Sequence, residues 1–175
     1  MERIYQLACS TGQVARFGVF GSFVTEKAEP NDVDVIMIME DSFDLASVSG
    51  EAVLVFQHSE ADAHFGASVF WVRRSAALGG EQAMLEHWQV RREGGRRGIS
   101  RDCGGGIMIQ NDEQLKTTLE RIAWFQQQVA QLRKTESNPV NYRASVSGFL
   151  AEIDRMQLQV REYFSLHPSE PVGAA

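Results

Sequence analysis

Short runs of apolar residues, separated by polar turns, fill the first part of the chain. Residues 14–20 and 35–39 are mostly apolar, and the first run stops at glycine while the second stops at acidic residues. Such bounded runs predict buried strands. A third run at 68–73 predicts another strand, with Phe70 and Trp71 on opposite faces because side chains alternate along a strand. The pattern predicts a small sheet.

Helices are expected around and between these strands. Apolar residues within 2–10 indicate a short helix, and 79–92 read as a longer one. Between the second and third strands we expect a helix over about 51–63 that ends at Gly66, since such connections usually contain a helix. By composition alone, 52–58 is also compatible with a strand.

The apolar spacing changes to alternating steps of three and four from residue 111 onwards, which predicts two long helices. The first should run from 111 to about 134, with Asn111 or Asp112 as its cap. The second should follow Pro139, placed in its first turn, and continue to about 166. The apolar positions are Leu115, Thr118, Ile122, Phe125, Val129 and Leu132, then Tyr142, Val146, Phe149, Ile153, Met156, Val160 and Tyr163.

The predicted fold class is therefore α/β (α+β): a small mixed sheet with flanking helices, followed by an antiparallel helical hairpin. Three consecutive glycines at 104–106 suggest a boundary. We expect domains at 1–103 and 108–175 joined by a glycine-rich junction at 104–107, which could mark a fusion. The apolar stripes of the hairpin should meet the first domain, a second copy or another protein.

The candidate chemistry lies between the first two strands. Asp32 and Asp34 are two residues apart, so on a strand their side chains share one face. Adjacent carboxylates repel each other unless a cation lies between them, and Mg²⁺ or Mn²⁺ prefers carboxylate oxygens. Gly21 and Ser22 form a turn in which main-chain N–H groups and a hydroxyl could approach a phosphate.

Gly21-Ser22 followed by Asp32-Val33-Asp34 resembles the Gly-Ser…Asp-x-Asp motif of polymerase-beta-like nucleotidyltransferases, over roughly residues 12–101. Minimal members occur in bacteria and phages. The resemblance implies that Asp32 and Asp34 hold the metal and act in catalysis. It also implies that Gly21 and Ser22 bind the triphosphate, with Thr25 and Lys27 as further candidates from the loop. The expected activity is transfer of a nucleoside monophosphate to a protein or RNA acceptor.

The third strand departs from this family pattern. The pattern implies a third carboxylate there, whereas the strand carries Ser68. Glu60 and Asp62 could substitute only if the fold brought them to the site. The alternative function is therefore a catalytically impaired scaffold that acts through its helical hairpin, by oligomerisation or by binding a partner helix over 111–166.

The hairpin has resemblances of its own. Residues 141–163 resemble small helical proteins of toxin–antitoxin operons, in which a nucleotidyltransferase usually modifies a partner. Arg161 and His167 also fit the Arg-x(4–6)-His motif of HEPN ribonucleases, in which the histidine would act as an acid or base. The position of His167 just before Pro168 equally suits a helix-end cap.

Composition narrows the setting. The chain of 175 residues has a net charge of −6, which argues against a general nucleic-acid coat. It has two cysteines far apart and no apolar run long enough to cross a membrane, so we expect a cytoplasmic protein. A local basic cluster could still contact phosphates or RNA, or simply be solvated. It consists of Arg91, Arg92, Arg96, Arg97 and Arg101.

Overall fold

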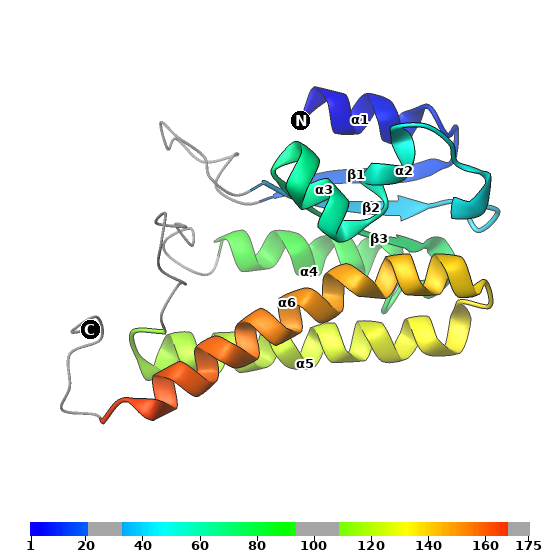
Figure 1. Cartoon of the computed structure of the whole chain (residues 1–175). Helices are drawn as coiled ribbons and strands as arrows, with labels where there is room; N and C mark the ends of the chain where they lie inside the picture. The colour runs from blue at the N-terminus through cyan, green and yellow to red at the C-terminus, as the bar shows by residue number, and fades with distance from the viewer. Residues whose placement is uncertain (21–32, 94–108, 168–175) are drawn as a thin grey trace.

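The computed structural model describes residues 1–20, 33–93 and 109–167. Figure 1 shows a small sheet with helices on both sides. In chain order the elements are α1 (Glu2–Cys9), β1 (Val14–Phe20), β2 (Val33–Met39), η2 (Leu45–Ser47), α2 (Ala52–Val55), α3 (His58–Phe65), β3 (Ala67–Arg73), η3 (Arg74–Ala76), α4 (Glu81–Glu93), α5 (Asp112–Thr135) and α6 (Pro139–Ser165).

The three strands form one mixed sheet in the order β1-β2-β3. Strand β1 runs antiparallel to β2, whereas β3 runs parallel to it. The parallel pair needs a crossover, and α2 and α3 supply it. The predicted class, a mixed sheet with flanking helices and a helical hairpin, is confirmed.

Each face of the sheet has its own apolar core. On one face, Ile36, Ile38, Phe70 and Val72 pack with residues of α4, α5 and α6. On the other, residues of β2 and β3 including Trp71 pack with α1, α2 and α3. Phe70 and Trp71 therefore point to opposite faces, as the strand alternation predicted. Figure 1 shows the same division, with α1–α3 above the sheet and α4–α6 below it.

The prediction of one helix over 51–63 is wrong in one respect, because the structure has two helices in this segment, α2 and α3. The main-chain oxygen of Phe56 accepts a hydrogen bond from Trp71 Nε1 at 2.9 Å, and Gln57 has extended backbone with φ −109° and ψ 109°. A carbonyl taken by a side chain and an extended residue together interrupt a helix. Gly66 ends α3 as predicted, with a φ of +64° that glycine adopts without strain.

The free edge of β3 is covered by α6. Ser145 Oγ donates to the main-chain oxygen of Trp71 at 2.5 Å. Asn141, which is fully buried, accepts from the N–H of Leu45 at 2.8 Å and donates to the oxygen of Phe43 at 2.7 Å. Buried main-chain groups without partners are costly, so these side chains complete the hydrogen bonding of β3 and of the loop after β2.

Glycine makes the close approach of α6 possible. A Cβ at Gly148 would lie 3.0 Å from His58 Nδ1 and 3.2 Å from both Phe70 Cδ1 and the oxygen of Val69. A glycine inside a helix costs about 0.5–1 kcal/mol relative to alanine, and here it lets helix and strand pack backbone to backbone.

Charged and amide side chains hold the α5–α6 turn and the neighbouring part of α5 in place. Arg73 Nη2 donates to Glu136 Oε1 at 2.7 Å, and the Glu136 side chain is 1% exposed. Gln128 of α5, fully buried, accepts from the N–H of Leu78 and donates to the oxygen of Ala76. These contacts tie α5 and the α5–α6 turn to the chain that follows β3.

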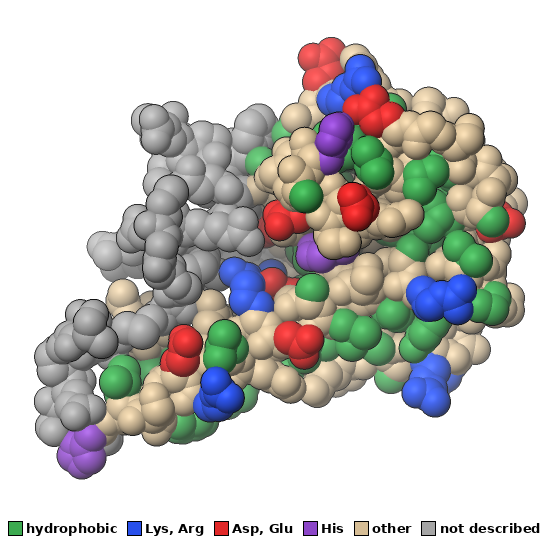
Figure 2. All heavy atoms as spheres, in the orientation of Figure 1, with side chains coloured by type: hydrophobic (Ala, Val, Ile, Leu, Met, Phe, Trp, Pro, Cys, Tyr) green, Lys and Arg blue, Asp and Glu red, His purple; other side chains and the backbone are tan. Residues whose placement is uncertain are grey.

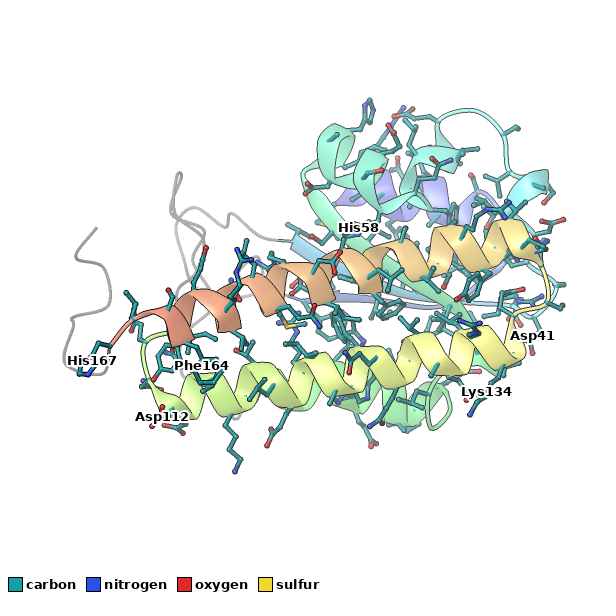
Figure 3. All side chains as sticks on the ribbon, turned by 60° about the horizontal axis from the view of Figure 1, so that its bottom comes forward. Asp41, His58, Asp112, Lys134, Phe164 and His167 are labelled. Carbon is teal, nitrogen blue, oxygen red and sulfur yellow. The ribbon has the colours of Figure 1, made fainter. Side chains whose placement is uncertain are left out.

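The hairpin itself agrees closely with its prediction. Asn111 caps α5, since its side chain accepts from the N–H of Gln114 at 2.9 Å. Pro139 is the first residue of α6, and Asn138 caps that helix. Tyr163 Oη donates to Asp112 Oδ1 at 2.9 Å, so the end of α6 lies beside the start of α5, as antiparallel packing requires. Figure 3 shows Asp112 and Phe164 at this end and Lys134 at the other.

The first prediction concerns Asn141. The Asn141→Ala variant should lower the free energy of unfolding by about 2–4 kcal/mol, because it leaves one buried N–H and one buried carbonyl without partners. Urea denaturation followed by tryptophan fluorescence measures this. Val140→Ala is the matched control, since Val140 is 40% exposed on the same helix turn and should change stability by less than about 0.5 kcal/mol. Equal effects of the two changes would contradict the role of Asn141.

The second prediction concerns the division into domains. Nearly half of the buried residues in the core beneath Phe70 come from α5 and α6. Residues 1–108 alone should therefore show no cooperative urea unfolding and should bind a hydrophobic dye. A cooperative transition in that fragment would show instead that the first part folds independently of the hairpin.

Candidate functional site

The end of the sheet nearest Gly21 brings three strand residues into one row. Phe20, the last residue of β1, pairs with Asp34 of β2, and Asp34 pairs with Ser68 of β3. Paired residues on neighbouring strands point to the same face. Asp34 and Ser68 therefore share the face of Ile36 and Phe70, the one that α4–α6 cover. The sequence placed Ser68 on the third strand, and the register sets it directly beside Asp34.

Much of the predicted phosphate-binding loop lies outside the residues that the structure describes. The same holds for the side chains of the basic cluster between 91 and 101. Of the predicted metal ligands, Asp34 is described and is partly buried. The predicted site residues outside the described ranges are Gly21, Ser22, Thr25, Lys27 and Asp32.

The substitutes considered for the third carboxylate do not join Asp34. Glu60 and Asp62 are both exposed on α3. Within the described ranges, no three histidine, cysteine, aspartate or glutamate side chains lie close enough together to hold a metal ion. Among the described residues, Asp34 is thus the predicted metal ligand that lies at this end of the sheet.

Aromatic side chains pack beneath this row. Trp88 of α4 lies 5.6 Å from Phe20 and 5.1 Å from Phe70, measured between ring centroids. Its Nε1 is buried and has no hydrogen-bond partner among the residues that the structure describes. His87, the preceding residue, stacks on Trp124 at 3.8 Å with nearly parallel rings. The row thus lies on an apolar base formed by α4, α5 and the sheet.

His58, the first residue of α3, lies at the outer edge of β3 and faces α6 (Figure 3). Its Nδ1 is 3.2 Å from the main-chain oxygen of Val69. Because a carbonyl oxygen only accepts, Nδ1 carries the proton in this contact, and Nε2 of the neutral ring is then an acceptor. The ring also lies 5.5 Å from that of Phe70. His58 of α3 thus contacts Val69, the residue that follows Ser68 on β3.

A carboxylate and two arginines form a cluster on the hairpin. Arg155 Nε donates to Glu152 Oε2 at 2.8 Å, and its Nη2 donates to Glu152 Oε1 at 2.5 Å. Arg121 of α5 approaches the same Oε1 at 3.3 Å. The Glu152 side chain is only 11% exposed. We call Arg121, Glu152 and Arg155 the arginine pair cluster.

Successive contacts of α6 locate this cluster. Ser145 contacts Trp71, and Gly148 lies against Val69, so α6 runs from the end of β3 towards its start. Glu152, one turn beyond Gly148, therefore comes level with the start of β3, the end at which Ser68 and Asp34 lie. Figure 2 shows basic and acidic side chains side by side over the middle of α6.

A hollow of about 240 Å³ lies at the other end of the sheet, away from Asp34. Its lining carries hydroxyls and the amide of Gln13 but no titratable side chain. Nothing in it could act as a general acid or base. The ribonuclease candidates lie elsewhere again, with Arg161 and His167 both exposed at the far end of α6. The histidine follows the helix, whose last residue is Ser165.

The sequence interpretation missed His58 and the arginine pair cluster. These residues are far from the Asp-x-Asp motif in the chain, and the docking of α6 brings them to the same end of the sheet. One sequence signal was present, because Gly148 interrupts an otherwise regular helical pattern. An isolated glycine inside a helix often marks close contact with another segment.

A third prediction tests the register of Asp34 and Ser68. Ser68→Asp should place a second carboxylate about 5 Å from Asp34 and destabilise the metal-free protein by roughly 1–3 kcal/mol through like-charge repulsion. In EDTA the melting temperature should fall below that of the isosteric Ser68→Asn control. Millimolar Mg²⁺ or Mn²⁺ should restore it, because a cation between the carboxylates removes the repulsion.

Equal melting temperatures of the Asp and Asn variants in EDTA would contradict this arrangement. A difference that divalent cations leave unchanged would confirm the register but exclude a cation site between the two positions.

Comparison with known proteins gives one result. A family of unknown function, DUF6932, matches residues 1–102. No curated protein and no solved structure matches the chain. In the described part of the chain, no helix combines the length and apolar character needed to span a membrane. Since the match covers more than half of the sequence, the chain belongs to the DUF6932 family.

Proposed function

We propose that this protein binds a nucleoside triphosphate with Mg²⁺ or Mn²⁺ and transfers a nucleoside monophosphate to a protein or RNA partner, in the setting of a toxin–antitoxin system. The position of Asp34 carries the proposal. It lies at the start of β2, paired with the last residue of β1, after which Gly21 and Ser22 follow directly. The motif that resembles nucleotidyltransferases thus joins two strands of a mixed sheet, as that resemblance requires.

Each motif residue has a role in this proposal. Asp32 and Asp34 would hold the divalent cation, whose charge offsets that of the phosphate oxygens. The type of donor supports this assignment of the cation. The carboxylate oxygens of Asp34 bind a hard cation better than the hydroxyl of Ser68 does. Gly21 and Ser22 would orient the triphosphate, with Thr25 and Lys27 as further contacts.

The reaction balances without any other reactant. The acceptor hydroxyl oxygen bonds to the α-phosphorus, the bond from that phosphorus to the bridging oxygen breaks, and pyrophosphate leaves. The hydroxyl proton is released in the same exchange. The protein's contribution is to position the two reactants and to oppose the phosphate charge.

A second candidate function is a catalytically impaired scaffold that binds a partner or a second copy through its hairpin. Two observations favour it. Ser68 occupies the position of the expected third carboxylate, beside Asp34. The outer surface of the hairpin also exposes large apolar side chains, and surfaces of this kind often mark interaction sites. They include Leu119, Leu150, Leu158 and Phe164, whose exposed fractions are 44%, 44%, 46% and 66%.

The fourth prediction separates the two functions. Titration calorimetry with each nucleoside triphosphate should detect binding with Mg²⁺ and a large loss of that binding in EDTA. Asp32→Asn and Asp34→Asn should each weaken the metal-dependent binding at least tenfold, because each removes a charged ligand. Glu162→Gln, an equal charge change at an exposed position of α6, is the matched control and should change affinity less than twofold.

Absence of binding by any triphosphate at millimolar concentration would refute the transferase. Binding that survives both aspartate changes would place the nucleotide elsewhere. In either case, the oligomeric state of wild type and Leu158→Glu, measured by light scattering, would test the scaffold function.

A further inference from the structure

We propose that the outward face of α6 binds the same face of a second copy of this chain, with the two helices antiparallel. The partner is therefore the protein itself. This inference goes beyond nucleotide transfer and does not depend on it. It gives the hairpin of the second candidate function one specific partner and one specific register.

A second stripe of residues runs along α6 beside the buried one. Val146, Phe149 and Ile153 belong to the buried stripe and pack in the core. The positions that follow them by one residue lie about 100° further around the helix. These positions recur at alternating steps of three and four, as in the seam of a helix pair, and nearly all are exposed. They are Val140, Arg143, Ser147, Leu150, Asp154, Gln157, Arg161 and Phe164.

Large apolar side chains are concentrated on this stripe. Val140, Leu150 and Phe164 are 40%, 44% and 66% exposed. Leu158, next to Gln157 of the stripe, is 46% exposed. Six large apolar side chains are exposed among the described residues, and α6 carries these four. Figure 2 shows apolar side chains interspersed with acidic and basic ones along α6. Exposed apolar side chains gathered on one helix indicate an interaction surface.

The charges on the stripe indicate a second copy as the partner. The side chains of Arg143 and Asp154 are exposed, and neither makes a hydrogen bond or ion pair within the described residues. Eleven positions separate them, close to three helical turns, so they share one face. An antiparallel copy can set Arg143 opposite the partner's Asp154. A two-fold axis repeats each such contact, so two ion pairs form at once.

Other arrangements of the same two helices lack this complementarity. Parallel pairing about a two-fold axis would set like residues together, Arg143 with the partner's Arg143 and Asp154 with the partner's Asp154. An antiparallel shift of one heptad towards the end of α6 would set Arg143 opposite the partner's Arg161. Both arrangements oppose like charges, which is unfavourable. The charge pattern therefore selects one orientation and one register.

The apolar side chains fit the selected register. The two helices then overlap over about residues 139–158 of each copy. Leu150 lies opposite the partner's Ser147, so a large side chain meets a small one on each side of the two-fold axis. Val140 at one end of the overlap comes close to the partner's Leu158 at the other. Large residues facing small ones allow two helices to interdigitate.

A solvated helix face is the competing explanation, since single exposed leucines are common on monomeric proteins. A helix of a different protein is another possible occupant of the stripe. In both cases the purified chain would remain a monomer. Self-association that depends on the two opposed charges occurs only if the stripe recognises itself.

The fifth prediction is tested by sedimentation velocity of the full chain over a concentration series. Wild type should pass from monomer to dimer in the micromolar range, as expected for a small interface. Arg143→Glu and Asp154→Arg should each weaken the dimer about tenfold, because each turns two ion pairs into two repulsions. The two substitutions change the net charge in opposite directions, so a general charge effect would not weaken both.

Glu162→Arg is the matched control for Asp154→Arg. It makes the same charge change at an exposed position of α6 that lies outside the overlap, and it should change the dissociation constant less than about threefold. An equimolar mixture of Arg143→Glu and Asp154→Arg should recover the wild-type dimer. In the mixed dimer the two reversed charges attract each other, and so do the two native ones. Circular dichroism of each variant confirms that it is folded.

Three results would overturn the inference. The first is a wild type that stays monomeric up to the high micromolar range. The second is a dimer that neither charge reversal weakens, and the third is a mixture that stays as weak as its components. Nucleotide binding by a monomeric chain would leave the transferase proposal standing, and a dimer without nucleotide binding would leave the present one standing, so the two fail separately.

Discussion

The contact between α6 and the free edge of β3 is the interaction on which the rest of the structure depends. A three-stranded sheet has two edges, and an uncovered edge leaves main-chain groups without partners. Ser145 satisfies the carbonyl of Trp71, and Gly148 lets the helix reach the backbone of Val69. The same docking places Phe149 over Phe70 and closes the core beneath the sheet. The hairpin is thus part of the structure that makes the sheet stable.

This contact also explains which parts of the fold could be predicted from the sequence. Strands and helices followed from local periodicity, so their bounds agree to within a few residues. The break between α2 and α3 did not, because it depends on Trp71 Nε1 reaching the carbonyl of Phe56 from a different element. The packing of α6 on β3 was one of three alternatives for the apolar surface of the hairpin. Periodicity shows that a helix has an apolar side but not what covers it.

The candidate site also contains residues that the sequence predicted and residues that it did not. Asp34 and Ser68 could be placed on their strands from the sequence, and the strand register then makes them neighbours. His58 and Glu152 lie 94 positions apart in the sequence, and only tertiary packing brings their elements together. The sequence therefore did not indicate that either residue lies at this end of the sheet. Motifs identify residues that are close in sequence. Groups supplied by a distant helix become visible when its register on the sheet is known.

Ser68, beside Asp34, also affects the charge at this end of the sheet. With one carboxylate fewer than the resemblance implies, this end of the sheet carries less negative charge and repels a phosphate chain less. The hairpin places Arg121 and Arg155, which both contact Glu152, at the level of Ser68. The serine thus disfavours tight binding of a second cation at this end of the sheet. Under the proposed function, one cation held by Asp32 and Asp34 would then have to provide the charge compensation that two metal ions share elsewhere.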